Sequence, residues 1–315
     1  MKKGYLYIAV AVVMFTSFEV VLKFIAGQIN SVQLTFCRFS IGFLFLLPVA
    51  LYTLKTRNQT LDRKSIAYFA LLGLTGIALS MPILHLAVNY TDSAVVAVLF
   101  SCNPVFVTFL AFFLLGEPIQ RRHIAALTLE IIGTVALINP FHTNLNLTGI
   151  VLALLSTALF SVYGVMGKRK CAEFGGAVAT CFSFLFGSLI VLIFILITHI
   201  PAVAGAFTAA GLPGFANIPI FAGYTMENLP YVLYVSAGVA GVGFCAYFLA
   251  MEYQPASMVS LVYFFKPALS PLLAWWLHGE QLSSNMLLGI ALIVCGSLCN
   301  IIPGIIEVKR PAIHR

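Results

Sequence analysis

Long apolar runs follow one another along the chain, and short polar segments separate them. A helix that crosses a bilayer needs about 20 predominantly apolar residues. Almost no sequence remains for a soluble domain, so the pattern predicts an all-α integral membrane fold of ten transmembrane helices. The predicted spans cover residues 5–26, 34–54, 66–88, 93–115, 123–140, 148–167, 177–198, 230–251, 256–277 and 286–303.

The composition strengthens this prediction, because 61% of the residues are hydrophobic and only 9% are charged, against about 25% charged in a soluble domain. The basic residues gather at the N-terminus, in the C-terminal tail and in every second connector between spans. Basic connectors stay on the cytoplasmic side of a membrane. We therefore expect a multi-pass protein of the cytoplasmic (inner) membrane with both termini in the cytoplasm. The net charge of +7 reflects orientation and indicates no nucleic-acid partner.

The sequence carries no motif of a catalytic or cofactor-binding site. Its seven cysteines form no CxxC pair, and no P-loop, HExxH or GxSxG pattern is present. We expect no metal, no cofactor and no enzymatic activity, and the sequence leaves the oligomeric state open. A membrane-embedded enzyme is the least favoured alternative, because it would need acid, base or metal groups that converge at one depth.

The chain contains an internal repeat. Residues 86–133 align with 249–296 at a constant offset of 163, and twelve of the 48 aligned positions are identical. The first spans align at an offset of 145, and the difference predicts extra residues in the long segment 200–228. The repeat predicts two halves of five spans, residues 1–140 and 141–315. Because five is odd, the second half enters the membrane from the opposite side, and inverted repeats are typical of secondary transporters.

The strongest shared segments are "NPVFVTFLAFFLLGE" and "KPALSPLLAWWLHGE", which close the fourth and ninth predicted spans. Two five-span halves with these Pro and Gly-Glu positions resemble the EamA-type branch of the drug/metabolite transporter superfamily. His278 and the long segment 200–228 depart from the family pattern. The resemblance implies a central cavity lined by spans 1–4 and 6–9, with spans 5 and 10 at the periphery. It leaves the substrate open.

Lys266 lies in the middle of the ninth predicted span, where a charge is costly and marks a functional site. Pro267 follows it, and we expect the proline to kink the helix and free a backbone carbonyl beside the lysine. The repeat places Asn103 and Pro104 at the matching positions of the fourth span. We expect Lys266 and Asn103 to contact the substrate and the two prolines to support gating. The alternative is a structural lysine that pairs with a buried carboxylate.

Glu19 and Lys23 lie four residues apart in the first span and share a helix face. Three roles are open for Glu19: a pair with Lys23, a pair with Lys266, or direct coupling as a proton acceptor or partner of a substrate ammonium. Ser17 and Tyr163 are expected as further substrate-binding residues in the cavity wall, with ordinary helix packing as the alternative.

His85 lies near the end of the third span. An imidazole ionises near neutral pH, which suits a gating or coupling role, and a hydrogen bond at a helix interface is the alternative. Arg38 lies early in the second span, and we expect it to snorkel to the membrane surface. Glu117 and Glu280 follow the Gly of the repeated motif and are expected to tie the connectors.

These features together predict a secondary transporter that exports small polar organic metabolites, amino acids or related solutes, by alternating access. Protons are the candidate coupling ion, and facilitated diffusion is the alternative. The second hypothesis is a flippase for lipids or lipid-linked carriers on the same scaffold, in which Lys266 would hold a phosphate headgroup. Membrane lipids surround the protein in either case.

Overall fold

The computed structural model describes residues 2–119, 121–138, 146–278 and 284–309, which form helices and the connections between them. The α-helices are α1 (Lys2–Leu22), α2 (Ser31–Thr56), α3 (Arg63–Gly73), α4 (Ser80–Val88), α5 (Ser93–Ser101), α6 (Asn103–Leu115), α7 (Arg121–Ile138), α8 (Leu147–Phe174), α9 (Gly176–Ile197), α10 (Pro201–Ala209), α11 (Leu229–Leu233), α12 (Phe244–Tyr253), α13 (Ala256–Val259), α14 (Val262–His278) and α15 (Ser284–Lys309).

Eight helical segments are long and apolar enough to cross a membrane. They match eight of the ten predicted spans, and the protein is therefore a multi-pass membrane protein. The predicted fifth and tenth spans fall on α7 and α15. Their apolar stretches within the described residues, His123–Ala136 and Ser284–Gly296, are shorter. The count of ten spans and the inverted repeat stay predictions. The eight segments are Lys3–Ile25, Ser31–Thr56, Arg63–Val88, Val95–Leu115, Leu147–Phe174, Gly176–Ile197, Leu229–Tyr253 and Ala256–Leu273.

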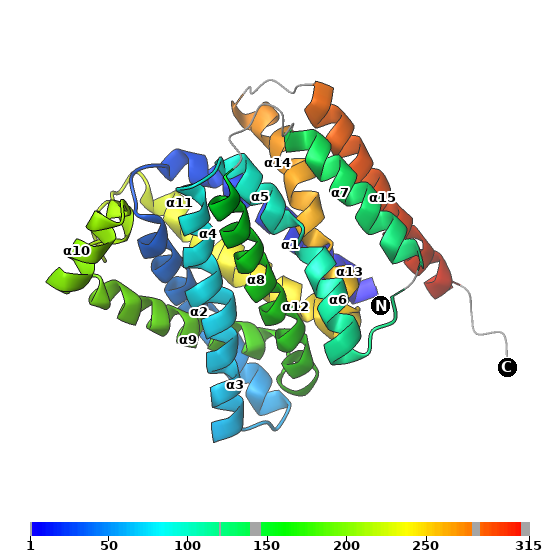
Figure 1. The fold of residues 1–315 in the computed structure, drawn as a ribbon. Coiled ribbons are helices and arrows are strands. Elements are labelled where there is room, and N and C mark those ends of the chain that lie inside the picture. The colour runs from blue at the N-terminus through cyan, green and yellow to red at the C-terminus, as the bar shows by residue number, and fades with distance from the viewer. Residues whose placement is uncertain (1, 120, 139–145, 279–283, 310–315) are drawn as a thin grey trace.

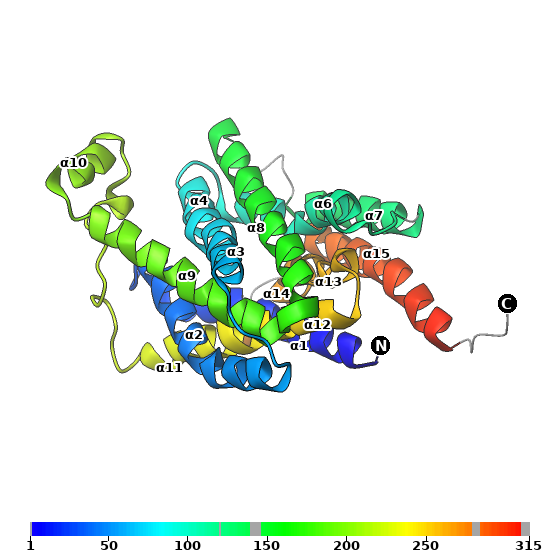
Figure 2. The same cartoon turned by 90° about the horizontal axis from the view of Figure 1, so that it is seen from below.

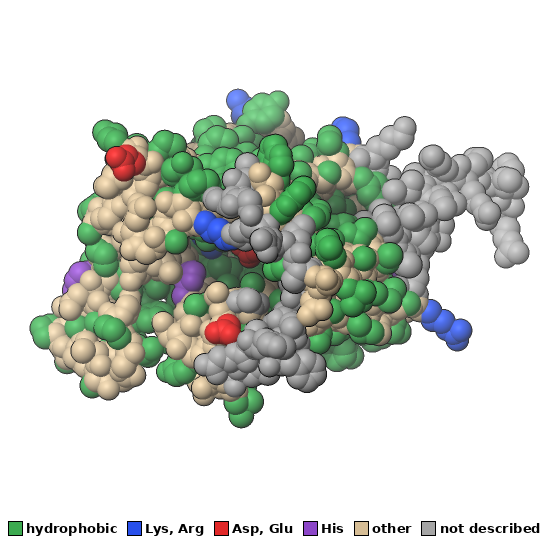
Figure 3. All heavy atoms as spheres, turned by 90° about the horizontal axis from the view of Figure 1, so that it is seen from above, with side chains coloured by type: hydrophobic (Ala, Val, Ile, Leu, Met, Phe, Trp, Pro, Cys, Tyr) green, Lys and Arg blue, Asp and Glu red, His purple; other side chains and the backbone are tan. Residues whose placement is uncertain are grey.

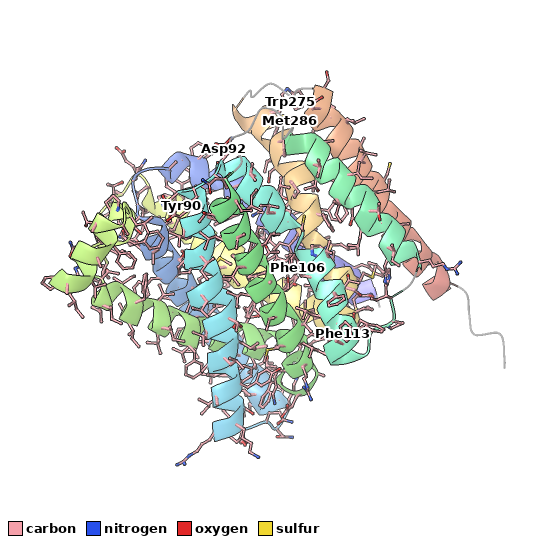
Figure 4. The ribbon with its side chains drawn as sticks, viewed as in Figure 1. Tyr90, Asp92, Phe106, Phe113, Trp275 and Met286 are labelled. Carbon is pink, nitrogen blue, oxygen red and sulfur yellow. The ribbon has the colours of Figure 1, made fainter. Side chains whose placement is uncertain are left out.

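Large apolar side chains cover much of the outer surface of the bundle. Phe113 on α6 and Trp275 on α14, both labelled in Figure 4, are 64% and 54% exposed. In water such a surface would drive association. In a bilayer, lipid chains solvate it, so these exposures agree with a membrane location.

The bundle has two ends that differ in their connections (Figures 1 and 2). The loop end carries residues 26–30 and the long segment 200–228. The basic end carries the start of α1 and the Arg57 and Lys168 side chains. At the loop end, the Gln33 amide donates hydrogen bonds of 3.2 and 2.7 Å to the carbonyls of Ile220 and Ala222. These bonds hold the long segment against the start of α2.

Two spans contain π-helical segments. The span from α3 to α4 includes η2 (Leu74–Leu79), and the span from α11 to α12 includes η5 (Tyr234–Gly243). The repeat offset of 163 carries residues 74–79 onto 237–242, inside η5. π-Helical turns are rare interruptions of the α-helical hydrogen-bond pattern, and they occur frequently at functional sites. The third span of each half therefore shares one local irregularity.

The fourth and ninth spans, which share the aligned prolines Pro104 and Pro267, are interrupted at different places. The fourth span is interrupted at Cys102, between α5 and α6, directly before Asn103 and Pro104. In the ninth span, α13 ends at Val259 and α14 begins at Val262. Pro267 lies inside α14 without interrupting it. The interruption of the ninth span therefore lies several residues before Pro267, and the kink at Pro267 stays a prediction.

Glycine allows close helix contacts in the half of the bundle toward the basic end. A Cβ atom on Gly76 would collide with the buried ring of Tyr163, and one on Gly167 would collide with the ring of Phe248. Both rings are fully buried. Aromatic rings in glycine notches therefore fill this half of the bundle.

Candidate functional site

A cavity of about 350 Å³ opens at the loop end, where Gly27 and Ser31 form part of its rim. Its walls come from α1, α2, α4, α5, α8, η5, α12 and α14. The described parts of α7 and α15 line none of it; the two helices pack side by side at the edge of the bundle (Figures 1 and 2). Figure 3 looks onto the loop end and shows a hollow near its centre, with hydrophobic side chains inside it and basic and histidine side chains at its edge.

Lys266 reaches the cavity from α14 and forms an ion pair with Glu19 of α1, with 2.7 Å between Nζ and Oε1. The Lys266 side chain is 16% exposed and that of Glu19 is 35% exposed. The Lys266 Nζ also lies 5.6 Å from the centre of the Phe18 ring. Of the pairs that the sequence left open for Glu19, the structure shows the one with Lys266, and a direct coupling role stays a prediction.

Arg38 lies inside the protein, so the expected snorkelling is wrong. The residue is only 7% exposed and lines the cavity from α2. Its guanidinium carbon lies 4.8 Å from the Phe18 ring centre and 4.6 Å from that of Phe39. The Nη2 group donates to the Met81 sulfur at 3.2 Å. Stacking on two aromatic faces holds this cation within the bundle instead of letting it extend to the surface.

His85 lines the cavity from α4, the helix that packs beside the Arg38-bearing α2. Its Nε2 lies 3.2 Å from the Thr35 hydroxyl oxygen, in a hydrogen bond between α4 and α2. This hydrogen bond agrees with the expected role at a helix interface. The gating role of His85 stays a prediction.

Aromatic rings close the bottom of the cavity. Phe15 packs edge to face on Phe244 at 4.9 Å between ring centres and stacks on Tyr263 at 5.6 Å. Phe160 contacts both Phe244 and Tyr263. Edge-to-face and offset aromatic pairs of this kind add to the energy of apolar burial. The floor therefore separates the cavity from the basic end.

The other predicted site residues lie outside the cavity in this conformation. Asn103 is fully buried and donates to the Ser161 hydroxyl at 2.7 Å. The Tyr163 hydroxyl lies 3.1 Å from that of Ser183. Ser17 bonds to Tyr234 instead. Neither Pro104 nor Pro267 contributes to the cavity wall.

Glu117 joins three spans at the basic end. Its carboxylate accepts hydrogen bonds from the backbone N–H groups of Ala256 (2.7 Å) and Ser257 (3.2 Å), at the start of α13. A carboxylate is a favourable cap for helical N–H groups. Lys168 of α8 pairs with the same carboxylate at 3.2 Å and donates to the Gln254 carbonyl at 2.6 Å. The expected tie is therefore a link from the fourth span to the ninth and the sixth.

These contacts set the charge of Glu117. Burial raises the pKa of its carboxyl group, but the hydrogen bonds from Ala256 and Ser257 and the Lys168 ammonium lower it by more. The pKa of Glu117 consequently lies below its ordinary value, and the carboxylate is ionised at neutral pH. Glu280 lies outside the described residues.

A second ion pair closes the same end. Arg57, at the end of α2, pairs with Glu252 of α12 at 2.6 Å. The other oxygen of Glu252 accepts the N–H of Gly176, the first residue of α9, at 2.6 Å. We call the contacts of Glu117 and Glu252 the basic-end seal. Sequence inspection missed the Arg57–Glu252 pair, because basic residues in connectors read as orientation signals.

The described residues contain no cluster of three or more His, Cys, Asp or Glu side chains that could hold a metal ion. The arrangement instead provides a solute-sized cavity with charged groups in and beside one wall.

Comparison with known proteins identifies the family. Residues 2–139 and 147–302 each match the EamA-like transporter family. An uncharacterized transporter of Clostridium kluyveri is 32% identical over 308 residues, which cover 95% of this chain and 93% of that protein. The uncharacterized transporter YetK of Bacillus subtilis is 24% identical over 95% of this chain and 87% of its own length.

One solved crystal structure superposes on 98% of this chain and 100% of its own, with a TM-score of 0.76 at 18% sequence identity. At this identity the match shows the fold alone. The family match covers both halves of the chain. The chain belongs to the EamA-like transporter family of the drug/metabolite transporter superfamily.

Proposed function

We propose that the protein is a secondary transporter that exports small polar organic metabolites, amino acids or related solutes, by alternating access. The observation that carries this proposal is a cavity of about 350 Å³ that opens at one end of the bundle while ion pairs close the other. A solute site that is accessible from only one side is what alternating access requires of each conformation.

The distribution of basic residues supports an orientation. Arg57, Lys168 and the start of α1 share one end, and basic connectors stay on the cytoplasmic side. In this orientation the protein lies in the cytoplasmic membrane with the seal inside. The described conformation then opens to the outside and corresponds to the release state of an exporter.

The inverse conformation requires two changes. The Glu117 and Glu252 contacts separate, and the walls of the loop end close around the solute. Paired π-helical segments in the third span of each half support such a change, because these turns mark sites where helices bend or adjust. The Glu19–Lys266 pair lies beside the cavity, where it is placed to exchange a coupling proton.

The test is a transport screen with the purified full chain in proteoliposomes. Labelled amino acids, organic acids and amines are loaded inside, and efflux is followed with and without an imposed proton gradient. We expect saturable flux of at least one small solute above that of empty liposomes. Scrambling of a fluorescent lipid without flux of any small solute would favour the flippase instead. Flux that is indifferent to the gradient would exclude tight proton antiport.

A further inference from the structure

The charges around the cavity do not balance. Lys266 and Arg38 are the cationic side chains in its wall, and the described lining contains no carboxylate. Lys266 is neutralised by Glu19 from beside the cavity. Arg38 has no ion-pair partner within the part of the chain that the structure describes. The cavity therefore keeps one positive charge without a counter-charge.

The hydrogen-bonding capacity of Arg38 is also unfilled. A guanidinium presents five N–H donors, and a thioether sulfur such as that of Met81 is only a weak acceptor. The Nε group of Arg38 is buried without a hydrogen-bond partner. Burial of a cation is costly unless an anion or strong acceptors compensate it. At 7% exposure, little water reaches this group, so the site lacks an acceptor that a ligand can supply.

The guanidinium is held in place before any ligand arrives. The rings of Phe18 and Phe39 lie 4.8 and 4.6 Å from its central carbon. A planar guanidinium binds a carboxylate through two parallel hydrogen bonds. Because the stacked rings limit its rotation, less entropy is lost when the anion binds.

The rest of the cavity wall has a polar part and an aromatic part. The Thr35 hydroxyl and the His85 ring lie in the same part of the wall and join α2 to α4. Phe100, Phe160 and Phe244 line the rest of the cavity with aromatic surface. A solute that fits both regions has a charged head and an apolar body.

We propose that Arg38 binds the carboxylate of the transported solute, and that the solute is a monoanionic organic acid with an apolar body. This inference rests on the proposed function and narrows its substrate class from amino acids and related solutes to monoanionic organic acids. The Glu19–Lys266 pair is neutral as a unit, so Glu19 is not free to receive a substrate ammonium. Arg38 is the one uncompensated cation in the described cavity wall. A solute with a net charge of −1 balances it, whereas a zwitterion brings an additional ammonium group that has no partner there. A phosphate monoester, with about −1.5 to −2 charges, exceeds what Arg38 balances.

The test uses two series of ligands that differ only in charged groups. The first is 3-phenylpropionate, phenylalanine and phenethylamine; the second is 4-methylpentanoate, leucine and 3-methylbutylamine. Binding to the full chain in nanodiscs is measured by calorimetry, with phenyl phosphate as a further probe. We expect each acid to bind at least about tenfold more tightly than the amino acid of its series, and the amines to bind weakest.

Variants assign this preference to Arg38. Arg38→Gln is expected to weaken binding of the acids at least about tenfold and to remove their advantage over the amino acids. Arg38→Lys keeps the charge without the planar fork and is expected to keep part of the preference. Arg63→Gln, an exposed arginine at the basic end, is the matched control and is expected to bind like the unchanged protein. Thermal unfolding of each variant shows that it is folded.

The outcomes separate this inference from the proposed function. Amino acids that bind as tightly as the acids, acids that do not bind, or Arg38→Gln with unchanged preference would each overturn the inference. None of these results bears on whether the protein transports solutes. Acid binding through Arg38 without flux in proteoliposomes would instead support a carboxylate site at Arg38 and contradict transport.

Discussion

The loop end and the basic end of the bundle differ in packing and in how their charged side chains are used. At the loop end, Arg38 and Lys266 line an open cavity with His85 beside them. At the basic end, aromatic rings fill glycine notches, and Glu117 and Glu252 bind helix starts. The cavity opens at one end, and ion pairs and packed rings join the helices at the other.

The repeat makes this difference sharper, because aligned positions carry different residues in the two halves. At four aligned positions one half carries an ionisable side chain, and the other half carries a small, amide or aromatic residue. The offsets of 145 and 163 pair Glu19 with Gly164, Arg38 with Ser183, His85 with Phe248 and Lys266 with Asn103. A perfectly symmetric chain would have no preferred direction. We infer that this exchange of charge for packing favours the conformation that opens at the loop end.

The largest expected effect comes from breaking the pair at the loop end. Lys266→Ala removes the ion-pair partner of the Glu19 carboxylate, which lies beside the cavity within a membrane-spanning helix. A carboxylate in such a segment is costly without a partner. We expect flux in proteoliposomes to fall more than about tenfold, which corresponds to about 1.4 kcal/mol in the barrier. Lys64→Ala, a change at an exposed lysine, serves as the control with unchanged flux.

The double variant Glu19→Gln/Lys266→Met separates folding from transport. It removes both charges, so we expect it to fold as well as the unchanged protein and still fail to transport. Normal flux through Lys266→Ala would refute a role for this pair in transport.

A smaller effect follows from filling a glycine notch at the basic end. In Gly167→Ala the new methyl group collides with the Phe248 ring, and overpacking of this kind costs about 1–3 kcal/mol. We expect a melting temperature several degrees lower in detergent. In Gly205→Ala, within α10, the added Cβ meets no atom within 4 Å. Because alanine has the higher helix propensity, its melting temperature should equal or slightly exceed that of the unchanged protein. Equal melting temperatures for both variants would show that this half is loosely packed.

The smallest expected effect is the pH dependence of the seal. The pKa of Glu117 is lower in the folded protein than its ordinary value. Its stabilising effect is therefore complete above the ordinary glutamate pKa of about 4.3 and is lost as the pH falls through the lower folded value. The melting temperature of Glu117→Gln should lie below that of the unchanged protein at neutral pH. The gap should close under acid conditions, and a gap that widens there would contradict this role.

The sequence predicted the spans better than the site. A run of about 20 apolar residues forms a helix in a bilayer, because its backbone N–H and C=O groups must form hydrogen bonds within the segment. Predicted span 34–54 thus falls inside α2, Ser31–Thr56. Lys266 was identified for the same reason, since a charge within such a run needs an explanation.

The partners of these charges depend on which helices become neighbours, and the linear pattern does not encode that. The sequence did not show that Glu19 pairs with Lys266, because that contact needs α1 and α14 side by side. Arg38 resembled a snorkelling residue near a span end, but two aromatic rings hold it inside. Asn103 and Tyr163 have the polarity of cavity residues, yet they satisfy it with Ser161 and Ser183 in the packed half.

The central claim is that opening of the basic end and closing of the loop end are one event. It is tested most directly with two single-cysteine forms of the protein: one keeps Cys171, fully buried near the basic end, and one carries Leu34→Cys in the cavity wall. Each is combined with Glu117→Gln, which weakens the seal, and with Glu173→Gln, an exposed control. Labelling by a membrane-impermeant maleimide is then measured from each side.

The account predicts reciprocal changes: in Glu117→Gln, Cys171 labels faster and the cysteine at position 34 labels more slowly, while Glu173→Gln changes neither rate. Rates that rise together, or a faster Cys171 with an unchanged rate at position 34, would contradict alternating access through this cavity.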